Sequence, residues 1–186
     1  GRLLTLARAI AKGAEEAGVQ VDVRRIESSH KEDTPDRFGD EVLQVPVVTN
    51  EEILAADAII VGAPGRQGRL CGQMAAFLDT WAEFQDKQAL TGKVGGAFTS
   101  TGGVGRGYGG HEAIFASFHA TFLQQGMVVA GIPPTDKMDH APHSSPFGAC
   151  MSGAAGTGAR DLTDEEILLA TSQGKHIASL AKKLSA

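Results

Sequence analysis

The stretch ADAIIVGAPGRQGRLCGQMAAFLD, residues 56–79, decides the fold that we expect for this chain. Near its start lies Ala58–Val61, a short apolar run without polar alternation. Such a run is typical of a strand covered on both faces in a parallel sheet. Three glycines and a proline then interrupt the apolar pattern: Gly62, Pro64, Gly65 and Gly68. Backbone without side chains lets a flat ligand approach closely, so this loop is a candidate binding site. An ordinary connection of about 2–6 residues between strand and helix is an equally good interpretation of this segment alone.

The composition limits the class of protein. The chain has 186 residues, of which 42% are hydrophobic, and this is enough for one core, so we expect a single domain over residues 1–186. A net charge of −5 without a Lys/Arg cluster argues against binding to nucleic acid. The apolar stretches are far shorter than the ~20 residues of a membrane span, and we expect a soluble, cytoplasmic protein. Cys71 and Cys150 lack metal-ligand spacing and are expected to be reduced thiols.

Helical and strand patterns alternate along the rest of the chain. Apolar spacing predicts helices over residues 3–17, 111–125 and 164–184. Apolar runs predict strands over residues 58–62, 93–100 and 127–132, and the alternation of 19–26 is compatible with another. Long loops are expected over residues 27–50 and 133–160. This order predicts a doubly wound parallel sheet with helices on both faces, and such a sheet opens with a central strand, which we expect to lie upstream of Gly1.

A second glycine-rich loop, Ser100–Gly110, lies between a predicted strand and a predicted helix. Gly105, Gly107 and Gly110 satisfy the GxGxxG pattern of dinucleotide-binding loops. The acidic residue that should follow about 20 positions later is missing, because residue 130 is alanine, so we attribute the match to glycine abundance. The loop is either a surface loop or a binding loop, and its place at the carboxyl end of a parallel strand favours binding.

Several motifs together carry a family resemblance. Residues 62–68 are followed by Gly-Gln-Met at 72–74 and Phe-Leu-Asp at 77–79, and Phe-Thr-Ser-Thr-Gly stands at 98–102. This series resembles the signature G-T-P-T-R-F-G…S-G-Q-M…F-L-D of the WrbA family of flavodoxin-like NAD(P)H:quinone oxidoreductases, and the similarity covers nearly the whole chain. The resemblance implies a flavodoxin-like α/β fold with a five-stranded, doubly wound parallel sheet. Residues 1–3 resemble the end of the family's phosphate loop.

The resemblance also implies the ligands. They are FMN as cofactor, NADH or NADPH as electron donor and a quinone as the small-molecule substrate. The implied cofactor-binding residues are Gly1, Arg2, Leu3, Pro64, Gly65, Arg66, Gln67, Gly68, Ser100, Thr101, Gly102, Gly103, Val104, Gly105 and Gln124. The phosphate is expected at the N-terminus of the first helix, where free N–H groups and the helix dipole attract an anion. The flavin supplies the redox chemistry, so we nominate no catalytic side chain.

Three aromatic positions of the family are glutamines in this chain. Gln67 stands where the family has Phe, Gln85 where it has a Trp of the active site, and Gln124 where it has a His of the active site. A glutamine offers a flexible amide instead of a flat wall for a quinone or nicotinamide. Tyr108 lies in a longer glycine loop and would either rebuild this wall or plug the site. We assign Gln85 and Tyr108 to substrate binding.

These replacements leave two functions open. The first is FMN-dependent two-electron reduction of quinones by NAD(P)H. The alternative is a catalytically impaired flavodoxin-fold protein that serves binding or assembly. Family members are typically tetrameric, so the resemblance implies a homo-oligomer in either case.

One cluster of metal-ligating residue types needs a separate interpretation. It consists of Asp136, Asp139, His140 and His143. Its spacing fits no pattern of a known metal site, so we expect a solvated loop and no bound metal.

Overall fold

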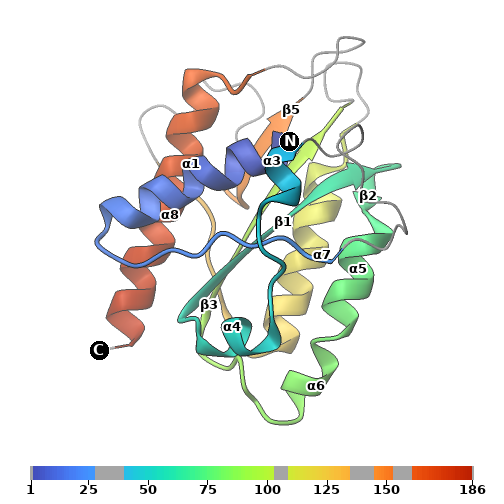
Figure 1. Cartoon of the computed structure of the whole chain (residues 1–186), viewed down its shortest axis with the longest axis vertical. Helices are drawn as coiled ribbons and strands as arrows, with labels where there is room; N and C mark the ends of the chain where they lie inside the picture. The colour runs from blue at the N-terminus through green and yellow to red at the C-terminus, as the bar shows by residue number, and fades with distance from the viewer. Residues whose placement is uncertain (1, 28–39, 103–108, 135–144, 153–160, 186) are drawn as a thin grey trace.

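Figure 1 shows a computed structural model of the chain, which describes residues 2–27, 40–102, 109–134, 145–152 and 161–185. The elements, in chain order, are α1 (Arg2–Glu16), α3 (Asp40–Leu43), α4 (Asn50–Ala55), β1 (Ala58–Arg66), β2 (Arg69–Leu70), α5 (Gly72–Asp79), α6 (Ala82–Gln85), β3 (Val94–Thr101), α7 (His111–Gln124), β4 (Val128–Val129), β5 (Ala149–Ser152) and α8 (Asp164–Leu184). No helix in these described ranges is both long and apolar enough to cross a membrane.

A mostly parallel sheet forms the centre of the molecule. β1 runs parallel to β3, in register from Ala58 with Val94 to Pro64 with Ser100. β4 and β5 are also parallel to β3, and they pair with its beginning and its end along the same edge. β2 is antiparallel to β1. The doubly wound α/β class is therefore confirmed, whereas a count of five parallel strands is not.

Two sequence predictions about strands were wrong. Residues 19–26 form no strand, and only Arg25 among them makes a β-bridge, to Val47. In contrast, β5 lies inside the segment that we predicted as a loop. Its sequence, Ala-Cys-Met-Ser, shows neither alternation nor β-branched residues, so only its pairing with β3 makes it a strand.

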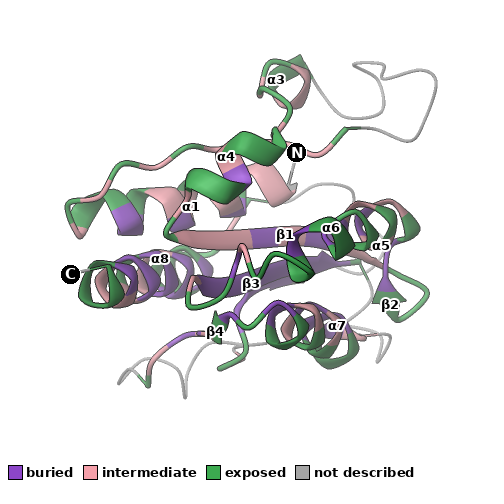
Figure 2. Cartoon of the chain, turned by 90° about the horizontal axis from the view of Figure 1, so that it is seen from below, coloured by how far each residue is buried: buried purple, intermediate pink, exposed green. Residues whose placement is uncertain are grey.

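The two faces of the sheet carry different helices, and Figure 2 shows α1 and α7 on opposite sides of β1 and β3. Ala97 belongs to the core that α5 and α7 build with Phe118 and Phe122. Phe98, the next residue of β3, belongs instead to a core with Leu6 of α1 and Leu169 of α8. Alternation along the buried strand thus assigns odd-numbered positions of β3 to α7 and even-numbered positions to α1 and α8.

Helices α1 and α8 cross in backbone contact, which fixes α1 against the sheet. A Cβ atom on Gly174 would lie 1.9 Å from the carbonyl oxygen of Ile10, and one on Gly13 would lie 1.9 Å from that of Thr171. Any side chain at these positions would separate the helices. The crossing therefore holds α1, whose N-terminus lies near the candidate site.

The predicted helix over residues 164–184 is confirmed as α8, and it begins as the sequence predicts. Thr163 accepts a hydrogen bond from the backbone N–H of Glu166, and the Glu166 carboxylate accepts one from the backbone of Thr163. This reciprocal capping box satisfies two N–H groups that the first turn leaves free.

Candidate functional site

The first glycine-rich loop is a β-hairpin. β1 continues through Gly62 and Pro64 to Arg66, so these residues do not end the strand as the sequence analysis expected. Gln67 and Gly68 form the two-residue turn, with φ angles of 51° and 73°. Positive φ at both central residues is the conformation of a type I′ turn, whose twist matches that of the flanking strands.

Gly65 is required by the core and not only by a ligand. A Cβ atom there would lie 2.7 Å from Cγ2 of Thr101 and 2.8 Å from Cδ1 of Ile114. Leu70, its cross-strand partner, is buried on the same side of the hairpin. The hairpin is therefore packed against α7 through Gly65 and Leu70.

The hairpin turn also contacts the beginning of α7. Gly110, the residue before α7, has a φ of 93°, and a Cβ atom on it would lie 2.6 Å from Cα of Gly68. Among the described residues, no atom lies within 4 Å of a Cβ atom built on Gly68 or Gly102. The two glycine-rich loops predicted from the sequence thus meet at the carboxyl end of the sheet.

A buried polar contact closes the base of the second loop. Oγ1 of Thr101, the last residue of β3, lies 2.8 Å from Nε2 of His111, the first residue of α7. Both residues are buried. This role of His111 could not be predicted from the sequence, because a histidine ten positions from a threonine gives no local signal of the contact.

The N-terminus of α1 lies at the same edge, toward which β1 and β3 point (Figure 1). Leu3 packs on the core shared by α1 and α8. The first turn of α1 has no acidic residue, so the positive end of the helix dipole is not neutralised from within the helix. Such a terminus favours binding of an anion.

Several predicted site residues lie outside the described residues. These are Gly1, Gly103, Val104, Gly105 and Tyr108. The candidate metal ligands between residues 136 and 143 are also outside them. In the part of the chain that the structure describes, no group of three or more His, Cys, Asp or Glu residues is placed to hold a metal ion.

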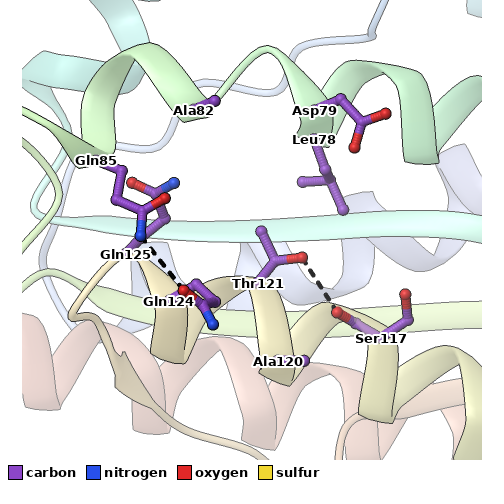
Figure 3. A pocket seen from close by; sticks show the side chains of 9 residues that line it. All are labelled: Leu78, Asp79, Ala82, Gln85, Ser117, Ala120, Thr121, Gln124 and Gln125. Atoms are coloured by element: carbon purple, nitrogen blue, oxygen red, sulfur yellow. Dashed lines mark hydrogen bonds between the residues drawn. The ribbon is translucent and has the colours of Figure 1, made fainter.

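Gln85 and Gln124 are together, but not at the glycine loops. Nε2 of Gln85 donates a hydrogen bond to Oε1 of Gln124 at 3.3 Å, and Figure 3 shows the two side chains pointing toward each other. They border a groove of about 400 Å³ between α5, α6 and α7, lined also by Leu78, Ala120 and Thr121. Gln124 lies 13 residues along α7 from His111, which is about 20 Å at a helical rise of roughly 1.5 Å per residue. Within one chain, Gln85 and Gln124 therefore do not join the loop site.

Cys150 contributes no reactive thiol to the site. Burial, together with Glu166 and Glu112, raises the pKa of Cys150 to about 12. Its thiol therefore stays protonated at neutral pH, and a protonated thiol is a poor nucleophile.

The residues at this edge fit a bound FMN. No described residue crowds the side-chain positions of Gly68 and Gly102, so a flat ring can approach the backbone there. Arg66 offers an exposed guanidinium, and the first turn of α1 offers N–H groups for a phosphate. The donor set is therefore that of an anionic, planar ligand.

Comparison with known proteins agrees with this geometry. The family described as NADPH-dependent FMN reductase matches residues 1–134. A protein of Geotalea uraniireducens named NAD(P)H dehydrogenase (quinone) is 40% identical over 196 residues, which covers 100% of this chain and 94% of the relative. A protein of the same name from Aromatoleum aromaticum is 39% identical over 194 residues, covering 99% and 92%.

Solved structures show the same fold at low identity. A flavodoxin, WrbA-like protein from Agrobacterium tumefaciens superposes with a TM-score of 0.65 at 17% identity, covering 96% of this chain and 88% of that one. A flavodoxin from the domain Archaea gives 0.61 at 22% identity, covering 98% and 92%. The flavodoxin-like fold and the resemblance to the WrbA family are therefore confirmed. The chain belongs to the NADPH-dependent FMN reductase family, and its relatives at about 40% identity carry the name NAD(P)H dehydrogenase (quinone).

Proposed function

We propose that this protein is an FMN-dependent NAD(P)H:quinone oxidoreductase, formed by one flavodoxin-like domain over residues 1–186. The contact between Gly68 and Gly110 is the observation that carries this proposal, since it joins the hairpin turn to the start of α7, where the second glycine-rich loop ends. The names of the relatives at about 40% identity support the same reaction.

Three segments would hold FMN. The N-terminus of α1, with residues 1–3, would bind the phosphate through backbone N–H groups. The hairpin, with residues 64–68, and the end of β3, with residues 100–105, would hold the ring system between them. The buried contact of Thr101 with His111 keeps the base of the second segment in place.

FMN, when bound, accepts two electrons from the nicotinamide donor and passes them to the quinone. The chain itself positions the reactants and limits their access to water. Packing of Gly65 and Leu70 against α7 makes the hairpin a rigid wall of the site. Rigid positioning matters because a misplacement of about 1 Å can reduce the rate on the order of a hundredfold.

The positions of Gln85 and Gln124 bear on the assembly. We assign both to the ligand site, with Tyr108. Gln124 lies about 20 Å along α7 from the loop site of its own chain, and Gln85 is hydrogen-bonded to Gln124. They can reach a flavin only from a neighbouring copy. We therefore infer a homo-oligomer in which the groove of one chain faces the loops of another, a tetramer by resemblance to the family, and we place it in the cytoplasm.

A binding or assembly protein without catalysis is the second candidate. The observation that favours it is the hydrogen bond between Gln85 and Gln124, which occupies with two amides the place where the family has rings. Such a protein would bind FMN and not reduce it.

Two measurements separate these functions. Titration with FMN should quench flavin fluorescence saturably, and a concentration about 100 times the Kd should raise the free energy of unfolding by about 2.7 kcal/mol. Stopped-flow absorbance should then show flavin reduction by NAD(P)H and its reoxidation by a quinone. Absence of binding to folded protein would refute the cofactor, whereas binding without reduction would identify the second candidate.

A further inference from the structure

A buried glutamine of α8 joins two strands of the sheet. Gln173 is fully buried, and its amide makes two hydrogen bonds with backbone groups. Nε2 of Gln173 donates to the carbonyl oxygen of Ala97 in β3 at 2.8 Å, and Oε1 accepts from the backbone N–H of Ala149 in β5 at 2.9 Å. Pairing between the two strands begins with Phe98 opposite Ala149. The amide therefore lies at the point where β5 joins β3.

β5 begins beside a break in the pairing along this edge of β3. The register of β4 ends at Gly95 and that of β5 begins at Phe98, so neither strand pairs with Ala97. Gln173 supplies the hydrogen bond to Ala97 that a strand would otherwise make. A Cβ atom on Gly148 would overlap the carbonyl oxygen of Ala97, so the chain enters β5 in close contact with β3. Among the described strands, β5 has β3 as its only partner.

β5 in turn holds the end of β3 that leads into the second glycine-rich loop. β1 pairs with β3 as far as Ser100, opposite Pro64, whereas β5 continues to Thr101, opposite Ser152. Thr101 is thus paired with β5 and with no other described strand. A displacement of β5 would reach Thr101 and the expected flavin-binding residues that follow it.

The same helix connects this end of the sheet with α1. Gly174, the residue after Gln173, lies in backbone contact with Ile10 of α1. Ala149 and Leu169 of α8 belong to one core cluster with Leu6 of α1. α8 therefore braces the helix expected to bind the flavin phosphate and, through Gln173, the strands expected to hold the flavin ring.

We propose that Gln173 is a positioning residue of the flavin site: its amide fixes β5 on β3 and thereby holds residues 100–102 in the conformation that receives the ring system of FMN. The inference rests on the proposed reductase function, and Gln173 acts through β5 and not by contact with the ligand. An amide suits this place because it offers a donor to the carbonyl group and an acceptor to the N–H group. Loss of either bond would leave a buried backbone group unpaired, which is unfavourable.

The first test replaces Gln173 by Met, an unbranched side chain of similar size that makes neither hydrogen bond. We expect the Kd for FMN and the Kd for riboflavin to rise by the same factor, on the order of tenfold, because misplacement of a binding group weakens its contacts with the ring. Fluorescence quenching measures both constants, and circular dichroism verifies that the variant is folded. Unchanged constants in the folded variant would overturn the proposal. A rise confined to FMN would also overturn it, because the effect would then lie at the phosphate end.

Gln173→Glu provides a rescue that a mere loss of packing would not show. A protonated carboxyl group can donate to Ala97 and accept from Ala149, as the amide does. The ionised form has no proton for the carbonyl group, and burial raises the pKa of such a carboxyl group well above its ordinary value. We expect the ratio of variant to wild-type Kd for FMN to be near 1 at pH 6 and about 10 at pH 9. A ratio that does not change with pH would contradict the role of the two hydrogen bonds.

Ile177→Ala is the matched control. Ile177 is buried one turn further along α8 and packs with Val94, at the beginning of β3. The change should lower the midpoint of thermal unfolding and leave both Kd values unchanged. Equal losses of affinity in Gln173→Met and Ile177→Ala would overturn the positioning role, because any weakening of α8 would then have the same effect.

Amide hydrogen exchange separates this inference from the proposed function. Gln173→Met should accelerate exchange in β5 relative to β4, which lies on the same edge of β3, and Ile177→Ala should not change this ratio. An unchanged ratio in Gln173→Met would overturn the inference whether or not flavin binds. Failure of the wild-type protein to bind either flavin would instead refute the proposed function.

Discussion

The backbone of Gly68 lies directly against Gly110, so the turn of the β1–β2 hairpin rests on the residue before α7. The two residues are 42 positions apart in the sequence and belong to the two glycine-rich loops. Gly110 has no room for a side chain at this contact, because a Cβ atom on it would lie 2.6 Å from Cα of Gly68. The contact therefore sets the distance between the two walls of the candidate flavin site.

Replacing Gly110 with Ala should disturb both folding and binding. The change forces a Cβ atom into the backbone of Gly68 and imposes a φ of 93° on an alanine. We expect the free energy of unfolding to fall by about 1–3 kcal/mol in urea unfolding, and FMN affinity to fall with it. Gly109→Ala is the matched control, since nothing lies within 4 Å of a Cβ atom at that position. Equal effects of the two changes would contradict the role of the contact.

Gln67 offers a test of the turn itself. Its φ of 51° is left-handed, a conformation that Asn and Gly adopt more readily than Gln. Gln67→Asn creates an Asn-Gly turn, which is preferred in type I′ hairpins, and should raise the free energy of unfolding by about 0.5–1 kcal/mol.

Gln67→Phe should have the opposite effect on stability, because a bulky residue is strained at positive φ. Restoration of the family's aromatic residue thus acts against the turn, and any gain in turnover from Gln67→Phe would be accompanied by a lower midpoint of thermal unfolding. An unchanged midpoint in both variants would show that the turn carries no strain.

His119 makes the stability depend on pH. Its ring stacks on Phe115 and lies edge-on to Phe147, and its Nε2 has no hydrogen-bond partner among the described residues. Burial lowers the pKa of His119 below its ordinary value, although a hydrogen bond with the backbone of Phe147 acts in the other direction. The imidazole of His119 therefore takes up a proton more readily in the unfolded chain than in the folded one. As a result, the free energy of unfolding falls as the pH falls below about 6.5.

His119→Phe removes the titrating group and keeps the ring contacts. We expect the difference in free energy of unfolding between wild type and variant to change between about pH 7 and pH 5, with the wild type losing more at low pH. Urea unfolding at a series of pH values measures this difference. A constant difference would mean that the folded ring takes up its proton as readily as the unfolded one.

Periodicity predicted the helices well because their apolar faces are local signals. Helices α1, α7 and α8 begin and end within about two residues of the predicted bounds, as expected where 3.6-residue spacing and a cap such as Thr163 agree. Strand β5 was missed because its pairing partner, Phe98–Thr101, is about 50 residues away in the sequence. A strand of four residues without alternation is defined by that partner alone.

The sequence predicts only part of the candidate site, because only part of it depends on local patterns. Glycine-rich segments after strands are such patterns, and the described residues of both loops lie at the expected edge. The hairpin form of the first loop depends on the pairing of Gly65 with Leu70, which the sequence does not indicate. The distance of Gln124 from the loops depends on the direction and length of α7, and an assignment made by family position carries no information on that distance.

A complementation experiment tests the proposed homo-oligomer. Ala120 is exposed and lines the groove beside Gln124, so Ala120→Trp fills the groove without entering the core. If the groove of one chain faces the loops of another, this variant should bind FMN normally and lose kcat/KM for the quinone. A loop variant, Gly110→Ala, should lose FMN affinity and keep its groove.

Mixing and reassembling the two variants should then restore activity, because mixed oligomers contain sites with an intact loop from one chain and an intact groove from the other. Activity of the mixture above the average of the two separate variants is the expected result. The control mixes wild type with Leu123→Ala, an exposed change on α7 next to the groove that should leave the rates additive. The contradicting result is a mixture whose activity equals the average of the two separate variants, although mass spectrometry shows mixed oligomers. Gln85 and Gln124 would then lie outside the ligand site, because they are too far from the loops of their own chain to act there.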